Sequence, residues 1–195
     1  MNDIIVYIRG DMIICEKDKW VFVRNTKTAS RSLTNFLLNK FDCFEFGTYH
    51  GLTIPDTYKD FTVFIVLRNP LSRAVSAWKH IVIEYERKMK PYVSFKDYLT
   101  FKTFRPLGDC NFFLQYEVFQ QIEKFNTRII YYESLEYDVK DIFGDGTLKV
   151  IGKNFGYWRN EYTNELLELA IEAFDLDFKH FNYSKVLPDP IKLFL

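Results

Sequence analysis

The sequence has no excess of either sign of charge, because 26 lysine and arginine residues are matched by 26 aspartate and glutamate residues. Proteins that bind nucleic acid through a general basic surface carry a clear positive excess, so this class of function is not expected. The balance still allows small clusters of basic residues. With 48% hydrophobic and 27% charged residues, the composition is that of a globular protein rather than a disordered one.

Cysteine is scarce and long apolar runs are lacking. The spacing of Cys15, Cys43 and Cys110 matches no metal-binding motif, and their odd number argues against a framework of disulfides. No apolar stretch approaches the roughly 20 residues that cross a bilayer, and no signal peptide is visible. We therefore expect a soluble, cytoplasmic protein whose 195 residues form one domain.

The apolar pattern predicts strands that alternate with helices. Short apolar runs at 20–23, 61–67 and 128–132 have the length of buried strands. Residues 4–8 and 12–15 are expected to form an N-terminal hairpin around a glycine turn. The alternation favours the α/β class, with a mainly parallel central sheet that helices cover on both faces. Ligands of such sheets bind beyond the carboxyl ends of the strands.

Three helix starts are marked by residues that accept hydrogen bonds from free backbone N–H groups. Asn69 can cap the helix that follows the predicted strand at 61–67, and Ser94 with Asp97 resembles a capping box. Thr163 or Asn164 can cap the last long helix. These residues predict where the three helices begin.

Two strand-to-helix junctions carry the residue types that bind phosphate or sulfate. At the first, an apolar run ends in Lys27 and a cluster of hydroxyls, and then a helical pattern begins. A cation, several hydroxyls and the free N–H groups of a helix start together suit an anion. The second junction carries Arg68 and Ser76 in a similar place. Two anion sites on a small protein indicate a ligand with two separate anionic groups.

Taken alone, the first junction has a simpler interpretation. It lacks the glycines and the Gly-Lys-Ser/Thr ending of a Walker A loop. Lys27 could be a surface lysine, and Thr28 or Ser30 could be the cap of the helix. The presence of the second junction favours the anion site over this alternative.

Together the two junctions resemble the nucleotide-binding motifs of the sulfotransferases that use 3′-phosphoadenosine 5′-phosphosulfate (PAPS). Residues 25–33, Asn-Thr-Lys-Thr-Ala-Ser-Arg-Ser-Leu, resemble the 5′-phosphosulfate loop, commonly Pro-Lys-Thr-Ala-Ser-Thr-Ser. Residues 66–78, Val-Leu-Arg-Asn-Pro-Leu-Ser-Arg-Ala-Val-Ser-Ala-Trp, resemble the 3′-phosphate motif, commonly Val-x-Arg-Asp-Pro-x-x-Arg-x-x-Ser-x-Tyr. Residues 128–135 and 173–183 resemble two later segments of the family. The similarity thus covers most of the chain.

Within this superfamily the sequence is most similar to the carbohydrate branch of the heparan sulfate 2-O type. The wording Lys-Thr-Ala-Ser points there, as does Tyr49-His50-Gly51, which resembles the segment that carries the catalytic histidine of that branch. Three residues depart from the pattern: Thr26 stands for the usual proline, Arg31 for a threonine and Asn69 for an aspartate. The chain is also short, so we expect acceptor-binding insertions to be reduced or missing. The resemblance therefore says less about the identity of the acceptor than about that of the donor.

The resemblance implies a single sulfotransferase-like domain, residues 1–195, with a three-layer P-loop-like fold. The expected reaction moves a sulfuryl group from PAPS to a hydroxyl acceptor, with a sugar or glycan favoured, and needs no metal. Lys27 would stabilise charge on the leaving group. His50 would take the proton of the acceptor hydroxyl, because a pKa near 6.5 suits base work at neutral pH. Glu45 and Asp56 are alternative bases.

The resemblance also implies three groups of donor-binding residues. They are Lys27, Thr28, Ala29, Ser30, Arg31, Ser32, Arg68, Ser76, Lys153, Trp158 and Arg159. The first six would hold the 5′-phosphosulfate, and Arg68 would pair with the 3′-phosphate through its planar fork, with Ser76 adding a hydroxyl. The last three belong to a late basic loop that would contact phosphate or stack on adenine. A solvated basic loop is the alternative for that segment.

Two other functions compete with sulfuryl transfer. A non-catalytic module could keep the fold and bind PAPS or a related nucleotide without transfer, and Thr26, Arg31 and the short acceptor region motivate this alternative. A nucleotide or small-molecule kinase with a divergent phosphate loop is the other, although the missing Walker glycines argue against it.

Overall fold

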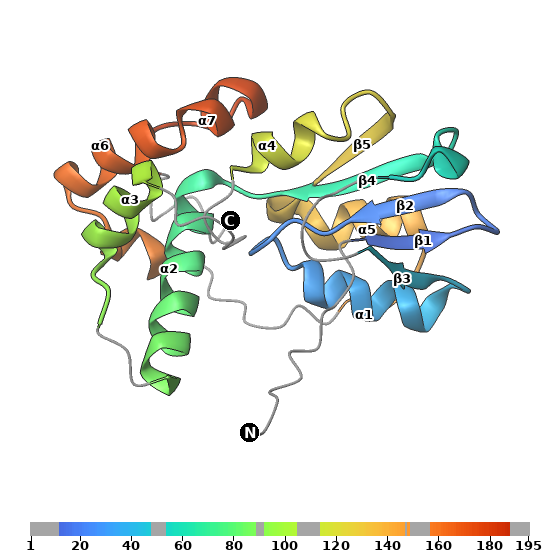
Figure 1. Cartoon of the computed structure of the whole chain (residues 1–195), viewed down its shortest axis with the longest axis horizontal. Coiled ribbons are helices and arrows are strands. Elements are labelled where there is room, and N and C mark those ends of the chain that lie inside the picture. The colour runs from blue at the N-terminus through green and yellow to red at the C-terminus, as the bar shows by residue number, and fades with distance from the viewer. Residues whose placement is uncertain are drawn as a thin grey trace. The chain divides into compact units, whose positions relative to one another are not determined.

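The protein is described by a computed structural model that covers residues 12–47, 54–88, 92–104, 114–146, 148 and 157–187 (Figure 1). Its chain divides into two compact units. The first unit takes its residues from Met1–Asn25, Ala29–Leu67 and Val118–Val150, and the second from Thr26–Thr28, Arg68–Glu117 and Ile151–Leu195.

The first unit is built on a five-stranded sheet in the order β3-β1-β2-β4-β5. The strands are β1 (Met12–Cys15), β2 (Trp20–Val23), β3 (Phe44–Phe46), β4 (Thr62–Leu67) and β5 (Asn126–Tyr131). Strand β1 pairs antiparallel with β2 and with β3, whereas β2–β4 and β4–β5 are parallel pairs. The predicted α/β class is confirmed, and the sheet is mixed.

The three predicted core strands are confirmed as β2, β4 and β5, with ends that shift by at most two residues. The predicted N-terminal hairpin is not tested as a whole, because residues 4–8 lie outside the described residues. Its second strand, β1, does form and makes a hairpin with β2. In the turn between them Lys19 takes a left-handed φ of 54°.

The helices and short 3₁₀ turns complete both units. They are α1 (Ser30–Lys40), η1 (Asp56–Tyr58), α2 (Pro70–Arg87), α3 (Phe95–Phe104), α4 (Gln115–Gln120), η3 (Tyr132–Ser134), α5 (Leu135–Phe143), η4 (Tyr157–Glu161), α6 (Asn164–Ala173) and α7 (Asp175–Phe181). Over the described ranges, none of these helices combines the length and the apolar character needed to cross a membrane.

The helix caps predicted from the sequence are confirmed. Asn69 Oδ1 accepts hydrogen bonds from the backbone N–H of Leu71 and Ser72 at the start of α2, at 3.0 and 3.3 Å. Ser94 and Asp97 bond reciprocally as a capping box at the start of α3. Thr163, rather than Asn164, caps α6 by accepting from the N–H of Leu166. Each cap satisfies N–H groups that the first turn of a helix leaves without a backbone partner.

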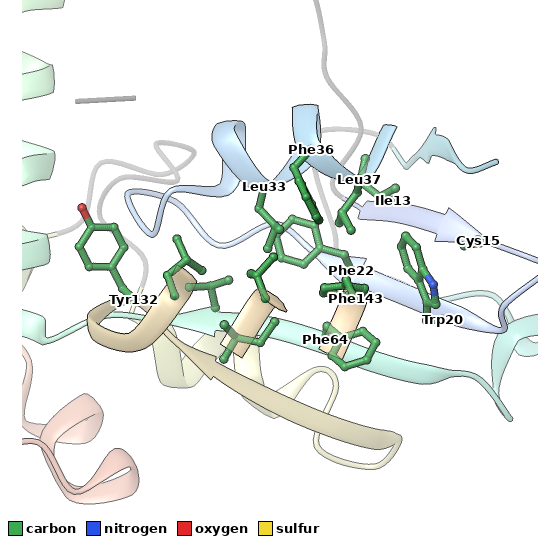
Figure 2. Close-up of a cluster of buried hydrophobic side chains, with 14 residues drawn as sticks. Ile13, Cys15, Trp20, Phe22, Leu33, Phe36, Leu37, Phe64, Tyr132 and Phe143 are labelled. Carbon is green, nitrogen blue, oxygen red and sulfur yellow. The ribbon is translucent and has the colours of Figure 1, made fainter. Parts of the chain in front are cut away.

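The core of the first unit is a cluster of aromatic and aliphatic side chains on one face of the sheet (Figure 2). Helix α1 contributes Leu33, Phe36 and Leu37, at the spacing that places side chains on one helical face. Helix α5 adds side chains of its own to the same cluster, so both helices cover this face of the sheet. Burial of these faces is the main force that holds the helices on the sheet.

Phe143, the last residue of α5, lies at the centre of the aromatic contacts. Its ring meets those of Trp20, Phe41 and Phe64 edge to face, with centroids 5.5, 5.9 and 5.0 Å away. Such pairs add about 0.5–1.5 kcal/mol each beyond the area that they bury. The ring therefore joins α5 to two strands and to the segment that follows α1.

We expect Phe143→Ala to lower the free energy of unfolding by about 3–5 kcal/mol, because it removes a buried ring and leaves a cavity. Tyr137→Ala on the same helix is the matched control, since that side chain is 75% exposed, and its effect should stay within about 0.5 kcal/mol. Urea unfolding measures both. Similar losses in the two variants would contradict this account of the core.

Candidate anion-binding site

The segment between β2 and α1 has an uncommon backbone conformation. Lys27 has a φ of 64° and Ala29 a φ of 62°, both in the left-handed region. This region is unfavourable for residues that carry a Cβ, so surrounding contacts must hold the segment in place. Left-handed residues in tight turns are also a feature of the backbone nests whose N–H groups bind anions.

Helix α1 begins without a side-chain cap. Its N-cap residue is Ala29, which makes no side-chain cap hydrogen bond, and the first turn contains no acidic residue. The alternative interpretation, in which Thr28 or Ser30 caps this helix, is therefore wrong, because Thr28 is buried before the helix and Ser30 is its first helical residue. Uncapped N–H groups give the start of a helix a partial positive charge, which favours an anion.

Arg68 contacts the segment that carries Lys27. Its Nη1 donates a hydrogen bond to the backbone oxygen of Lys27 at 3.1 Å, and its Nε donates to Ser72 Oγ at 2.8 Å. Both residues belong to the second unit. The structure thus brings together two cationic residues that lie 41 positions apart in the sequence. Ser76 is half-buried in α2, four residues after Ser72, and its predicted contact with the 3′-phosphate stays a prediction.

Gln115 is a site residue that the sequence did not reveal. Its side chain is fully buried and forms two hydrogen bonds with the backbone of Arg68. The N–H of Arg68 donates to Gln115 Oε1 at 2.8 Å, and Gln115 Nε2 donates to the carbonyl oxygen of Arg68 at 2.7 Å. The Gln115 amide therefore makes the two hydrogen bonds that a neighbouring strand would make, and it fixes the backbone from which the Arg68 side chain projects.

Arg73 is a second residue that sequence reasoning left without a role. Its side chain is fully buried in helix α2, and it donates two hydrogen bonds to Thr26, one to the carbonyl oxygen at 3.0 Å and one to Oγ1 at 2.9 Å. The one available signal was the second arginine of the 3′-phosphate motif. That signal does not identify Thr26, because the partner lies 47 positions away.

The remaining residues of the first predicted loop occupy the start of α1. Arg31 is exposed, Ser30 is half-buried and Ser32 is buried. The order along the chain therefore places one charged side chain at the surface within the first turn of the helix.

The late loop is described only in part. Lys153 lies outside the described residues. Trp158 and Arg159 are half-buried in η4, and the Trp158 ring packs edge to face on Tyr162 with centroids 6.2 Å apart. Tyr162 in turn donates a hydrogen bond to the carbonyl oxygen of Leu71 at 2.9 Å, and burial raises its pKa well above the usual value of 10.0. Trp158 is thus part of the apolar packing of the second unit, and its predicted contact with adenine stays a prediction.

The three candidate bases are placed differently. His50 lies outside the described residues. Glu45, in the edge strand β3, forms an ion pair with Arg24 at 3.1 Å between Oε2 and Nη2. Asp56 is exposed at the start of η1.

No protein-family model, no curated protein and no solved structure matches this chain. Within the part of the chain that the structure describes, no group of three or more His, Cys, Asp or Glu side chains is arranged to hold a metal ion.

We expect Gln115→Leu to reduce the free energy of unfolding by about 1–3 kcal/mol, because the backbone N–H and C=O of Arg68 lose their partners. Asn160→Leu, which replaces an exposed amide of the same unit, should change stability by no more than about 0.5 kcal/mol. Denaturant unfolding of the two variants beside the wild type measures the difference. A Gln115→Leu protein as stable as the wild type would show that the two hydrogen bonds contribute nothing.

Proposed function

We propose that the chain is a PAPS-dependent sulfotransferase with a P-loop-like fold, and that it transfers a sulfuryl group to a hydroxyl acceptor, with a sugar or glycan favoured. The observation that carries the proposal is the hydrogen bond from Arg68 Nη1 to the carbonyl oxygen of Lys27 at 3.1 Å. It joins the two motifs that resemble the phosphosulfate loop and the 3′-phosphate motif of that family. A donor with anionic groups at both ends suits two such motifs in contact.

The proposed donor contacts follow from the chemistry of each residue. The ammonium group of Lys27 suits the 5′-phosphosulfate. So do backbone N–H groups at the start of a helix such as α1, whose first turn holds no acidic residue. The guanidinium of Arg68, with its planar fork, suits the 3′-phosphate. Because Gln115 holds both polar groups of the Arg68 backbone, the guanidinium projects from a fixed base, and a fixed base lowers the entropic cost of binding.

The proposed reaction is an in-line displacement at sulfur. The acceptor oxygen forms a new bond to sulfur, while the bond from sulfur to the bridging oxygen breaks and leaves 3′-phosphoadenosine 5′-phosphate (PAP). Lys27 stabilises the negative charge that collects on this bridging oxygen, and a base takes the proton of the acceptor hydroxyl. Positioning and charge stabilisation supply most of the acceleration in such transfers.

His50 is the proposed base, with Asp56 and Glu45 as the carboxylate alternatives. Glu45 is the weakest of the three, because it would have to leave its ion pair with Arg24 before it could accept a proton. Asp56 carries no such restriction, since its side chain is exposed on η1. The pH range of the reaction separates a histidine from a carboxylate, because their ordinary pKa values differ by about 2–3 units.

A non-catalytic module that binds PAPS or a related nucleotide is the second candidate. Arg31 favours it, since this exposed arginine in the first turn of α1 adds a cation that could tighten binding without helping transfer. Mass spectrometry of a hydroxyl-acceptor library incubated with PAPS distinguishes the two candidates. Donor binding without any sulfated product across the library would favour the module.

Replacement of Lys27 tests the donor site. We expect Lys27→Ala to lower sulfuryl transfer from labelled PAPS by about 10²–10³-fold, by analogy with loss of one stabilising group at a developing charge, while its circular dichroism and melting temperature stay those of the wild type. Lys59→Ala, at an exposed lysine of the first unit, is the control and should transfer normally. Calorimetry in which the wild type binds neither PAPS nor PAP would end the proposal.

Replacement of the candidate bases tests the proton transfer. We expect His50→Ala to bind PAP as the wild type does and to turn over about 10²–10⁴-fold more slowly, because a general base contributes in that range. Asp56→Asn and Glu45→Gln, measured beside it, should retain turnover. If His50→Ala turns over normally and one of the carboxylate variants does not, the base is that carboxylate.

A further inference from the structure

Arg73 combines complete burial with the lack of a counter-ion. Of the residues in the described ranges, Arg73 is the largest whose side chain is fully buried. Among the residues that the structure describes, no carboxylate pairs with it, and its Nη1 has no hydrogen-bond partner. A buried charge without a partner is costly, so a residue of this kind needs a compensating role in the molecule.

Both hydrogen bonds of Arg73 go to one residue, Thr26. The Nε group bonds to the carbonyl oxygen at 3.0 Å, and Nη2 bonds to the hydroxyl oxygen at 2.9 Å. Since the guanidinium is planar, two bonds from one fork fix the backbone and the side chain of Thr26 at the same time. Thr26 is followed at once by Lys27, whose backbone is left-handed.

These contacts orient two successive peptide groups. In a trans peptide the C=O and the following N–H point in opposite directions. Because Arg73 holds the carbonyl of Thr26, the N–H of Lys27 is turned away from Arg73. Arg68 holds the carbonyl of Lys27 in the same manner, which sets the direction of the Thr28 N–H. Arg73 in α2 and Arg68 just before α2 thus set the directions of two backbone N–H groups of this loop.

We propose that Arg73 and Thr26 form a positioning pair that keeps the Lys27 loop in its left-handed, anion-binding conformation. The inference rests on the proposed function, because the loop is taken to receive the phosphosulfate of PAPS. Arg73 is a positioning residue, since complete burial keeps it from touching a ligand directly. Its charge also acts on the loop from a site that water does not reach, where screening is weak.

Replacement of the Thr26 hydroxyl distinguishes this positioning role of Arg73 from a general contribution to the stability of the fold. Loss of Arg73 removes a large buried side chain and is expected to impair folding. Thr26→Val keeps the side-chain volume and the carbonyl acceptor and removes the hydroxyl to which Arg73 Nη2 donates. Thr26→Ser restores the hydroxyl. Thr57→Val makes the same chemical change at an exposed threonine of the first unit and is the control.

The experiment measures amide hydrogen exchange of residues 27–29 and calorimetric binding of PAP in these variants of the full chain. We expect Thr26→Val to bind PAP about ten- to a hundredfold more weakly, the range for a lost hydrogen bond to a charged group. We also expect the loop amides to exchange at least about tenfold faster, for the same reason. Thr26→Ser should lie within about threefold of the wild type in both, and Thr57→Val should match it.

The two readouts fail in different ways. Wild-type exchange in Thr26→Val would overturn the positioning pair, whatever PAP does. If the wild type does not bind PAP, the proposed donor is wrong, but faster exchange in Thr26→Val alone would still support the positioning pair. Faster exchange with unchanged PAP affinity would overturn the claim that the conformation serves binding.

Discussion

The parallel pairing of β2 with β4 is the constraint on which the candidate site depends. It sets Val23 beside Ile65 near the carboxyl ends of both strands. Asn25 continues the link beyond the end of β2, because its buried side chain donates to the carbonyl oxygen of Val66 at 3.1 Å. Two chains that leave a sheet at the same edge bring their next residues close together. Arg68 directly follows β4, Lys27 lies four residues beyond the end of β2, and a hydrogen bond joins them.

The backbone conformation of the Lys27 loop costs free energy, and so does the burial of Arg73, which helps to hold the loop. Left-handed backbone disfavours residues with a Cβ, and burial disfavours a guanidinium without a counter-ion. The hydrogen bonds from Arg73 to Thr26 and from Arg68 to Lys27 offset part of both costs. Under the proposed function, a loop that these bonds already order needs less ordering when the anion binds, which lowers the entropic cost of binding.

Two residues that support the site could not be assigned that role from the sequence. Gln115 and Arg73 hold the backbone of Arg68 and Thr26. Gln115 matches no motif position, and Arg73 matches the second arginine of the 3′-phosphate motif, which does not identify its partner. Thr26 stands where the resembling sequences have proline, which restricts its own φ. Threonine has no such restriction, and here its hydroxyl is bonded from outside by Arg73.

Features that depend on neighbours in the sequence were predictable. The caps at Asn69, Ser94 and Thr163 follow from hydrogen bonds across two or three residues, and the apolar face of α1 follows from helical spacing. The N-cap of α1 was not predicted, because Thr28 and Ser30, the candidates in the alternative interpretation, have the right chemistry but the backbone places Ala29 at the cap. Local chemistry could not reveal a left-handed residue that distant contacts hold in place.

The sequence by itself determined the α/β class, the positions of the core strands and the two junctions that carry Lys27 and Arg68. These are set by local patterns of apolar, capping and basic residues. Only the tertiary structure decided that the two junctions touch, that Gln115 and Arg73 support them, and that α1 starts without a cap. Each of these contacts joins residues more than 40 positions apart or depends on such a contact, so it exists only once the strands have paired.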